Sequence, residues 1–193
     1  MKSPRHTRAA SALALALAFT APAALCAEVA GVKVEDTVRS EQGELLLNGA
    51  GLRTKIVFKV YVAALYLPQK ESNASAILQG KGPRRMVLRM MRNVDGDTLH
   101  EALDEGLRNN LGSAELDAIK APLARLSEVF KALGKAREGD IIQLDISQAG
   151  LAIAVNGTPR GQIASEALGR GLLRVWLGEK PAEASLKSAL LGQ

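Results

Sequence analysis

The stretch NGAGLRTKIVFKVYVAALYL, residues 48–67, decides the fold that we expect for this chain. Gly49 and Gly51 predict a turn, since glycine supplies the backbone freedom that tight turns require. The β-branched and aromatic residues after it are typical of a β-strand, and we expect one unbroken strand over residues 53–67. Pro68 ends this strand because proline has no backbone N–H to donate to a sheet.

The same stretch contains residues that we expect to bind a ligand. Arg53 is a ready partner for a carboxylate, and Tyr61 and Tyr66, the only two tyrosines, supply hydroxyl donors. In an unbroken strand Arg53 and Tyr61 share one face but lie about 26 Å apart at ~3.3 Å per residue. One ligand contacts both only if the chain folds back at the glycines or near residues 54–55. Tyr66 takes the opposite face unless a bulge resets it.

A purely structural interpretation of these residues stays open. Arg53 would then pair with a nearby acid such as Glu44, and Tyr61 would be a packed core residue. The two interpretations differ in whether a cavity adjoins the arginine.

The N-terminal residues have the composition of a secretory signal peptide. Three basic residues precede the apolar run of residues 9–21, which is too short and too rich in alanine to span a membrane stably. Small residues then allow cleavage within residues 23–27. We therefore expect a signal peptide at residues 1–27 and one domain at residues 28–193. This predicts a periplasmic or secreted protein with no membrane span after cleavage.

Composition excludes several classes of function. Three of the 25 basic residues and none of the 20 acidic ones lie in the signal peptide, so the mature chain carries a net charge of only +2. We therefore expect no nucleic-acid partner. One cysteine, Cys26, and one histidine beyond the signal peptide, His100, make neither a zinc site nor a disulfide, and they argue against a Ser-His-Asp arrangement. No phosphate-loop or complete dinucleotide motif occurs, so we expect no metal and no cofactor.

The order of the predicted elements indicates an α+β fold. Strands are expected at residues 31–36, 44–47, 53–67, 84–91, 140–147, 151–155 and 158–163. Helices are expected at residues 73–78, 98–111, 113–133, 165–177 and 181–191. Pro122 should bend or break the third helix, and Asn156-Gly157 is a strong hairpin signal. This order favours an antiparallel-rich sheet with a layer of helices on one face.

Taken together, these stretches resemble the chalcone isomerase-like family. Residues 48–67 match its Gly-x-Gly-x-Arg turn and the strand that ends in Leu-Tyr-Leu. Three later stretches follow in the same order: residues 114–133, the strand from Gly139 with its meander, and residues 172–186. The resemblance covers about the whole mature chain. It implies an open-faced β-sandwich, in which helices cover an antiparallel sheet and a ligand cleft lies between the two layers.

The family includes isomerases that close a chalcone to a flavanone, non-catalytic members, some of which bind fatty acids, and exported bacterial members. By this resemblance Arg53 matches the isomerase's arginine, and Tyr61 falls at the position of its strand threonine. Leu99, Gly106 and Val175 fall at or near the positions of its helix tyrosine, helix asparagine and C-terminal threonine. Most of the polar groups that orient the substrate are therefore replaced, unless the alignment slips by one turn to Asn109 or Asn110.

The residues therefore favour a binding protein over an enzyme. We expect an exported, non-catalytic bacterial protein that binds a small amphipathic acid such as a fatty acid. The expected ligand-binding residues are Arg53, Tyr61, Tyr66 and Trp176. The expected walls of the cleft are Ile56, Phe58, Val60, Leu103, Leu107, Leu172 and Trp176.

Two other functions stay open at this point. One is a weak isomerase (intramolecular lyase) of chalcone–flavanone type, in which Arg53 stabilises the developing negative charge. The other is a structural or partner-binding periplasmic protein whose cleft is closed.

Overall fold

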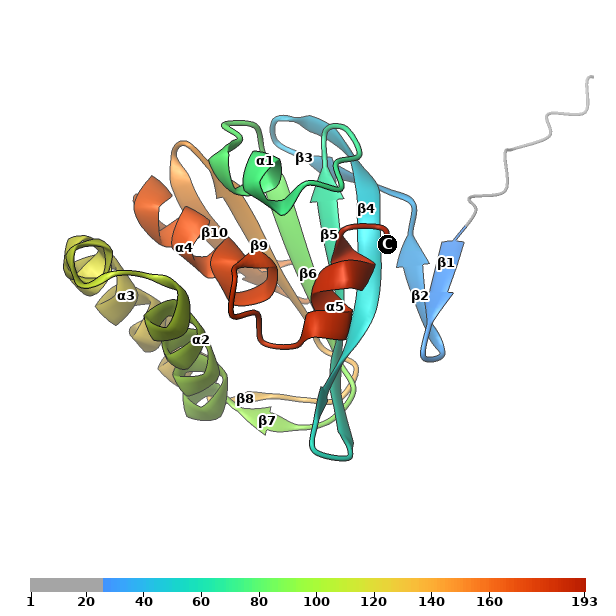
Figure 1. The fold of residues 1–193 in the computed structure, drawn as a ribbon. Coiled ribbons are helices and arrows are strands. Elements are labelled where there is room, and N and C mark those ends of the chain that lie inside the picture. The colour runs from blue at the N-terminus through green and yellow to red at the C-terminus, as the bar shows by residue number, and fades with distance from the viewer. Residues whose placement is uncertain (1–25) are drawn as a thin grey trace, which may run out of the picture.

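A seven-stranded antiparallel sheet is the frame of the molecule (Figure 1). The computed structural model describes residues 26–193. The predicted signal peptide lies outside these residues, apart from Cys26 and Ala27 at the start of the first strand.

The sheet has the strand order β11-β10-β9-β6-β5-β4-β3, and each pair of neighbours is antiparallel. Its strands are β3 (Thr37–Ser40), β4 (Gly43–Lys55), β5 (Phe58–Leu67), β6 (Arg84–Met90), β9 (Ile141–Ser147), β10 (Gly150–Val155) and β11 (Thr158–Ile163). Two short pairs stand outside it: β1 (Cys26–Val29) with β2 (Val32–Glu35), and β7 (Val94–Asp95) with β8 (Lys135–Ala136).

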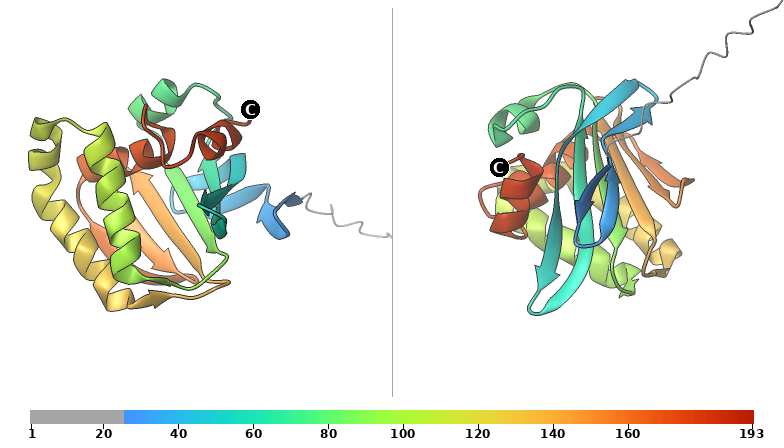
Figure 2. Two further views of the ribbon diagram at one scale, coloured as in Figure 1. Left: turned by 60° about the horizontal axis from the view of Figure 1, so that its bottom comes forward. Right: turned by 90° about the vertical axis from the view of Figure 1, so that its right-hand side faces the viewer.

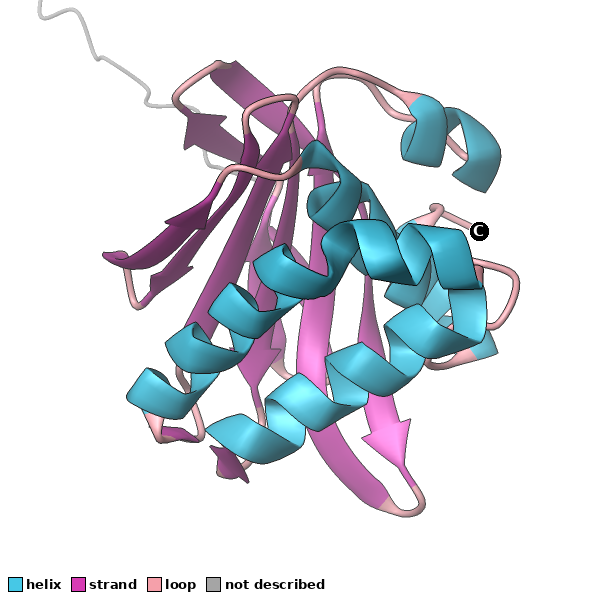
Figure 3. Ribbon diagram, turned by 90° about the vertical axis from the view of Figure 1, so that its left-hand side faces the viewer, coloured by secondary structure: helices cyan, strands magenta, loops and turns pink. Residues whose placement is uncertain are grey.

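Helices cover one face of this sheet (Figure 3). They are α1 (Ala74–Gln79), α2 (Gly96–Asn110), α3 (Ser113–Leu133), α4 (Glu166–Leu177) and α5 (Ala184–Leu190). The main hydrophobic core lies between the two layers, where the buried leucine stripe of α2, Leu99, Leu103 and Leu107, faces the sheet. The predicted α+β fold, an antiparallel sheet with helices on one face, is confirmed.

The opposite face of the sheet is covered only in part, by the β1–β2 hairpin (Figure 2). A second, smaller core lies there, built from Val34 of β2 and from Leu45, Val62, Ala64 and Tyr66 of the sheet. Alternate residues of β5 therefore serve two different cores.

The predicted single strand over residues 53–67 is wrong, because the chain turns back within it. β4 ends at Lys55, Ile56 and Val57 form the turn, and β5 begins at Phe58. Ile56 has φ 60°, a conformation that β-branched residues rarely adopt. Glycine, asparagine and aspartate are the residues that predict a turn at such positions, so the sequence does not predict this hairpin.

Gly49 and Gly51 do not form the predicted turn but lie inside β4, under α5. A Cβ atom on Gly49 would lie 2.1 Å from the carbonyl oxygen of Ala189, and one on Gly51 would lie 2.7 Å from the Cβ of Ala189. The two glycines therefore allow the last helix to pack directly on the strand. They serve packing rather than chain reversal.

Most of the remaining elements match their predictions. Asn156 and Gly157, with φ 51° and 75°, join β10 to β11 as expected. Asn73 caps α1 and Ser165 caps α4 through side-chain hydrogen bonds to backbone N–H groups. Pro122 does not break α3, which runs as one helix from Ser113 to Leu133. The predicted final helix at 181–191 is shorter and begins at Ala184.

Candidate functional site

The β4–β5 hairpin places Arg53 directly opposite Tyr61. The two residues are Cα partners in the antiparallel ladder, so their Cα atoms lie about 5 Å apart instead of eight residues along one strand. A bulge in β5 follows this pair, because Thr54 pairs with Lys59 and leaves Val60 as the extra residue. The condition under which one ligand contacts both residues, a chain reversal between them, is therefore met.

Tyr61 is buried and is linked to the helix layer. The indole Nε1 of Trp176, a buried residue near the end of α4, donates a hydrogen bond of 3.1 Å to the Tyr61 hydroxyl oxygen. Because Tyr61 accepts here, its own proton is left for another acceptor, and none bonds to it among residues 26–193. Burial raises the pKa of Tyr61, although the Trp176 bond and the charge of Arg53 act in the opposite direction. The phenol is therefore a neutral donor.

Arg53 forms an ion pair with Glu183, the residue immediately before α5. Its Nη1 donates to Glu183 Oε2 at 3.0 Å and also to the carbonyl oxygen of Thr54. The expected alternative partner, Glu44, lies elsewhere, opposite Arg39 in the β3–β4 ladder. An acid 130 positions away in the sequence is visible only once α5 is placed on β4.

Several donors converge on the Glu183 carboxylate. Oε2 also accepts from the backbone N–H of Thr54 at 2.8 Å, and Oε1 accepts from the hydroxyls of Thr54 at 3.0 Å and Ser185 at 2.9 Å. Partial burial acts to raise the pKa of Glu183, but the bonds from Thr54, Arg53 and Ser185 outweigh it and hold the pKa below its ordinary value. Glu183 is therefore an anion at neutral pH.

A cavity of about 330 Å³ adjoins Arg53 and Tyr61 between the sheet and the helices. Apolar residues of β5, β6, β9, α2, α3 and α4 form most of its wall: Val60, Leu88, Leu99, Leu103, Phe130, Ile142, Leu144, Val175 and Trp176. The charged residues on its lining are Arg53, Lys55, Glu105 and Lys180. Apolar walls with a few charged and polar groups are typical of sites for small organic ligands.

Tyr66 does not line this cavity. It lies on the opposite face of β5, in the second core, and its hydroxyl donates to the carbonyl oxygen of Glu35 at 2.9 Å. Five positions separate it from Tyr61, and an odd spacing along a strand places the two side chains on opposite faces. The structure thus brings Arg53, Tyr61 and Trp176 together and leaves Tyr66 out.

The expected walls are found in part. Val60, Leu103 and Trp176 line the cavity, whereas Leu107 and Leu172 are buried in the core beside it. Ile56 and Phe58 are exposed in and beside the hairpin turn, so their assignment to the wall was wrong. The assignment failed because it assumed an unbroken strand.

The positions taken from the family resemblance do line the cavity. Leu99, Gly106 and Val175 are all on its wall, and all three are apolar. Asn109 also lines it, while Asn110 bonds to the backbone of Gly106 and of Lys180. At Leu99, Gly106 and Val175 the wall can therefore make van der Waals contacts with a ligand, but its side chains supply no hydrogen bonds there.

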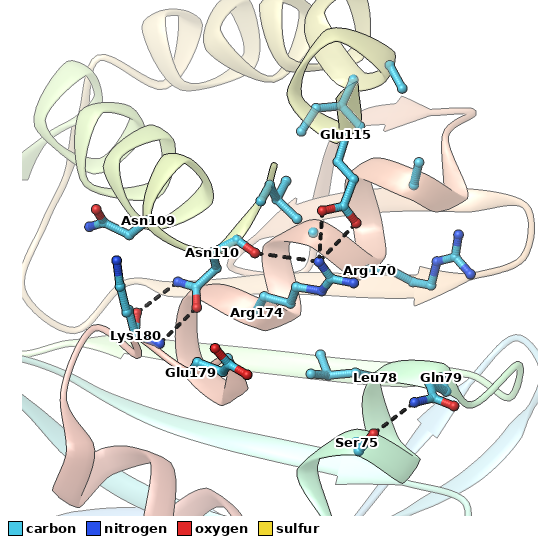
Figure 4. Close-up of a pocket in the computed structure, with 16 residues that line it drawn as sticks. Ser75, Leu78, Gln79, Asn109, Asn110, Glu115, Arg170, Arg174, Glu179 and Lys180 are labelled. Carbon is cyan, nitrogen blue, oxygen red and sulfur yellow. Dashed lines mark hydrogen bonds and ion pairs between the residues drawn. The ribbon is translucent and has the colours of Figure 1, made fainter. Parts of the chain in front are cut away.

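Two larger cavities have a different character. One of about 860 Å³ lies among α1, α3 and α4 and has charged walls, in which Arg174 pairs with Glu115 at 3.0 Å (Figure 4). The other, of about 570 Å³, lies on the opposite face of the sheet beneath β2 and includes Tyr66, Arg85 and Arg89. Within residues 26–193, no group of three or more His, Cys, Asp or Glu side chains is placed to hold a metal ion. No helix of this part of the chain is long and apolar enough to span a membrane.

Comparison with known proteins identifies the family. No curated protein matches the chain. The crystal structure of a fatty-acid binding protein of Arabidopsis thaliana is similar, with a TM-score of 0.65 and 17% sequence identity, over 83% of this chain and 92% of the plant protein. At that identity the likeness shows a shared fold. A model of the family described as chalcone isomerase-like matches residues 26–192, nearly all of the described chain. This protein therefore belongs to the chalcone isomerase-like family.

Proposed function

We propose that this protein is exported and binds an amphipathic carboxylic acid, with fatty acids as the leading class, in the cavity between sheet and helices. The carboxylate is held by Arg53 and Tyr61, and the alkyl chain lies against the apolar wall formed by β6, β9, α2 and α4. The plant fatty-acid binding protein with the same fold supports this choice of ligand class.

The observation that carries the proposal is the pairing of Arg53 with Tyr61 at the wall of an apolar cavity. The bonds of Arg53 to Glu183 and Thr54 both run through Nη1, so the guanidinium retains further donors. The Tyr61 hydroxyl also donates no hydrogen bond to any group within residues 26–193. A positive charge beside a buried neutral donor is suited to an ionised carboxylate.

Glu183 lowers the affinity of this site for an anion, because its carboxylate already neutralises part of the positive charge of Arg53. A second carboxylate beside the same guanidinium is repelled by Glu183, and this repulsion limits affinity. The size of the cavity, about 330 Å³, lies near the lower end of the ~300–1,000 Å³ typical of ligand sites. We therefore propose a short or medium alkyl chain rather than a bulky one.

Extraction of the purified protein tests the proposal. Mass spectrometry of the extract should detect a fatty acid bound to the wild type and to Arg89→Gln, which removes an exposed arginine beside the cavity of the opposite face. The same ligand should be lost from Arg53→Gln. Loss of the fatty acid from Arg89→Gln alone would assign the ligand site to the cavity on the other face of the sheet. An empty wild type that also fails to take up added fatty acid would contradict the proposal.

A chalcone cyclisation assay at neutral pH separates binding from catalysis. The apolar residues Leu99, Gly106 and Val175 on the cavity wall are the reason that we favour binding. We expect no rate above that of buffer. A rate above buffer that Arg53→Ala abolishes would instead assign the site to an intramolecular lyase.

The proposed export has its own test. Intact-mass analysis of protein recovered from the periplasmic fraction should give an N-terminus that follows cleavage within residues 23–27. A full-length chain in the cytosolic fraction would contradict export and leave the cavity proposal untouched.

A further inference from the structure

The large apolar residues that are exposed within residues 26–193 are consecutive. Ile56, Val57 and Phe58 are 90%, 80% and 54% exposed. They form the end of the β4–β5 hairpin, here called the hairpin tip, which extends past the edge of the helix layer (Figures 1 and 2). Single exposed apolar residues are common, but three in a row at a projecting turn are not explained by the fold.

The turn itself is built against local preference. Ile56 adopts φ 60°, where a β-branched residue is strained and glycine or asparagine is favoured. The β10–β11 hairpin also reverses over two residues, Asn156 and Gly157, which both have positive φ, suit that conformation and are polar or small. The tip of the β10–β11 hairpin therefore has the residues that its turn favours. The tip of the β4–β5 hairpin instead exposes apolar side chains to water.

Positive charge surrounds the hairpin tip. Lys55 and Lys59 flank it and are exposed, and the guanidinium carbon of Arg92 lies 4.7 Å from the centre of the Phe58 ring. Residues 53–59 contain no acid. An apolar point within a ring of lysine and arginine is complementary to an anionic lipid surface, where the apolar side chains enter the headgroup boundary and the cations contact phosphate.

The hairpin tip also adjoins the ligand cavity. Lys55 and Val60, one residue before and two residues after the tip, both line the cavity beside Arg53. A surface that contacts the tip would therefore lie next to the cavity that we propose for the amphipathic ligand.

We propose that the hairpin tip docks the protein on an anionic lipid bilayer, with the cavity facing the lipid. The three side chains of the tip are far fewer than the 20–30 residues, or about 800 Å² per partner, that stable protein interfaces bury, so a second copy of the chain is a poorer fit than a membrane. Docking itself needs no bound ligand. Its role, the exchange of an amphipathic acid with the bilayer, rests on the proposed function.

Co-sedimentation of the ligand-free protein with vesicles tests the docking. We expect binding to vesicles of phosphatidylcholine mixed with phosphatidylglycerol, little binding to phosphatidylcholine alone, and weakening by salt. Ile56→Asn with Val57→Gly gives this hairpin the turn residues of β10–β11. It should lower the affinity on the order of tenfold or more, with the thermal midpoint unchanged or raised.

A matched pair of charge variants tests the cationic ring. Lys55→Gln with Lys59→Gln should weaken binding about fivefold for each lysine. Lys120→Gln with Lys131→Gln removes the same charge from exposed positions of α3 and should have little effect. Equal vesicle binding by the wild type and the Asn-Gly variant, or none by the wild type, would overturn the proposal. Self-association that the Asn-Gly variant abolishes would assign the tip to a second copy instead.

Failure of docking and failure of ligand binding are distinguishable. The Asn-Gly variant should bind free fatty acid as tightly as the wild type, since Ile56 and Val57 do not line the cavity. It should be slower only in taking fatty acid from anionic vesicles. Vesicle binding without any ligand uptake would retain the docking and remove the proposed function.

Discussion

Tyr61 and Tyr66 lie in the same strand, are both buried, and reach opposite faces of the sheet. Tyr66 donates its proton to the carbonyl oxygen of Glu35 and so fastens β2 to the sheet. Tyr61 accepts a bond from Trp176 and keeps its proton beside a cavity. Both residues are buried, and the direction of one hydrogen bond separates a structural tyrosine from a candidate binding residue.

The arginines of the two faces differ in the same way. Arg85 is buried and uses Nε and Nη2 on Asp145 and Nη1 on the carbonyl oxygen of Arg39. Arg53 bonds to Glu183 through Nη1 alone and lines an apolar cavity. A guanidinium with every edge occupied stabilises the fold, whereas one with free donors can also bind a ligand.

Removal of Trp176 should have the largest effect on the cavity face. Trp176→Ala deletes a buried side chain and should cost about 3–5 kcal/mol of unfolding free energy. Trp176→Phe keeps much of the volume, loses the bond to Tyr61 and should cost clearly less. Urea unfolding measures both variants. Equal losses would show that the bond to Tyr61, rather than packing, dominates.

Exchange of each arginine for glutamine should separate the two faces. Arg85→Gln should cost about 1.5–3 kcal/mol of stability, because it breaks charge-assisted bonds at a buried position, and should leave fatty-acid affinity unchanged. Arg53→Gln should cost less stability, since Glu183 keeps its bonds to Thr54 and Ser185. Its main effect should be a loss of affinity of about 10- to 100-fold. A loss of ligand affinity in Arg85→Gln with no such loss in Arg53→Gln would contradict the comparison.

Glu183→Gln tests whether the carboxylate competes with the ligand. It should raise the affinity for a fatty acid, because the charge of Arg53 is no longer shared. Because folding lowers the pKa of Glu183, its contribution to stability is complete above its unfolded-state pKa and is lost as pH falls through the lower folded-state value. The difference in stability between wild type and Glu183→Gln should therefore shrink in acid. Unfolding curves across the acid range measure it, and a difference that does not change with pH would argue against the ion pair.

Removal of the two hydroxyl groups should give the smallest effects. Tyr66→Phe should cost about 0.5–1.5 kcal/mol of stability with no change in ligand affinity, because its hydrogen bond to β2 is lost. Tyr61→Phe should weaken ligand binding by several-fold, with a loss of stability at least as large as that of Tyr66→Phe, because the buried Nε1–H of Trp176 loses its acceptor. Calorimetric titration with a fatty acid, beside thermal unfolding, distinguishes the two outcomes.

Local chemistry made much of the fold predictable. The leucine stripe of α2, the caps Asn73 and Ser165 and the Asn156-Gly157 turn each depend on neighbouring residues, and the helices and the hairpin that they define lie where they were expected. The fold class followed from their order.

The parts that failed depend on distant residues. Gly49 and Gly51 are explained only by α5, which packs on them from the other end of the chain. Glu183 reaches Arg53 through the same packing. The turn at Ile56 and Val57 does not follow turn preferences, so the sequence predicted one strand there. The pairing of Arg53 with Tyr61, which the proposed site requires, therefore stayed conditional on a chain reversal that no local rule placed.

The most direct test compares decanoate, a medium-chain acid, with the alcohol of the same chain length. Trp176, the only tryptophan, lies on the cavity wall, so its fluorescence reports titration of the delipidated protein with either ligand. The wild type should prefer decanoate about 10- to 100-fold, and Arg53→Gln should bind both ligands with similar affinity. A wild type that binds acid and alcohol equally, or a preference that survives in Arg53→Gln, would contradict the assignment of the carboxylate to Arg53.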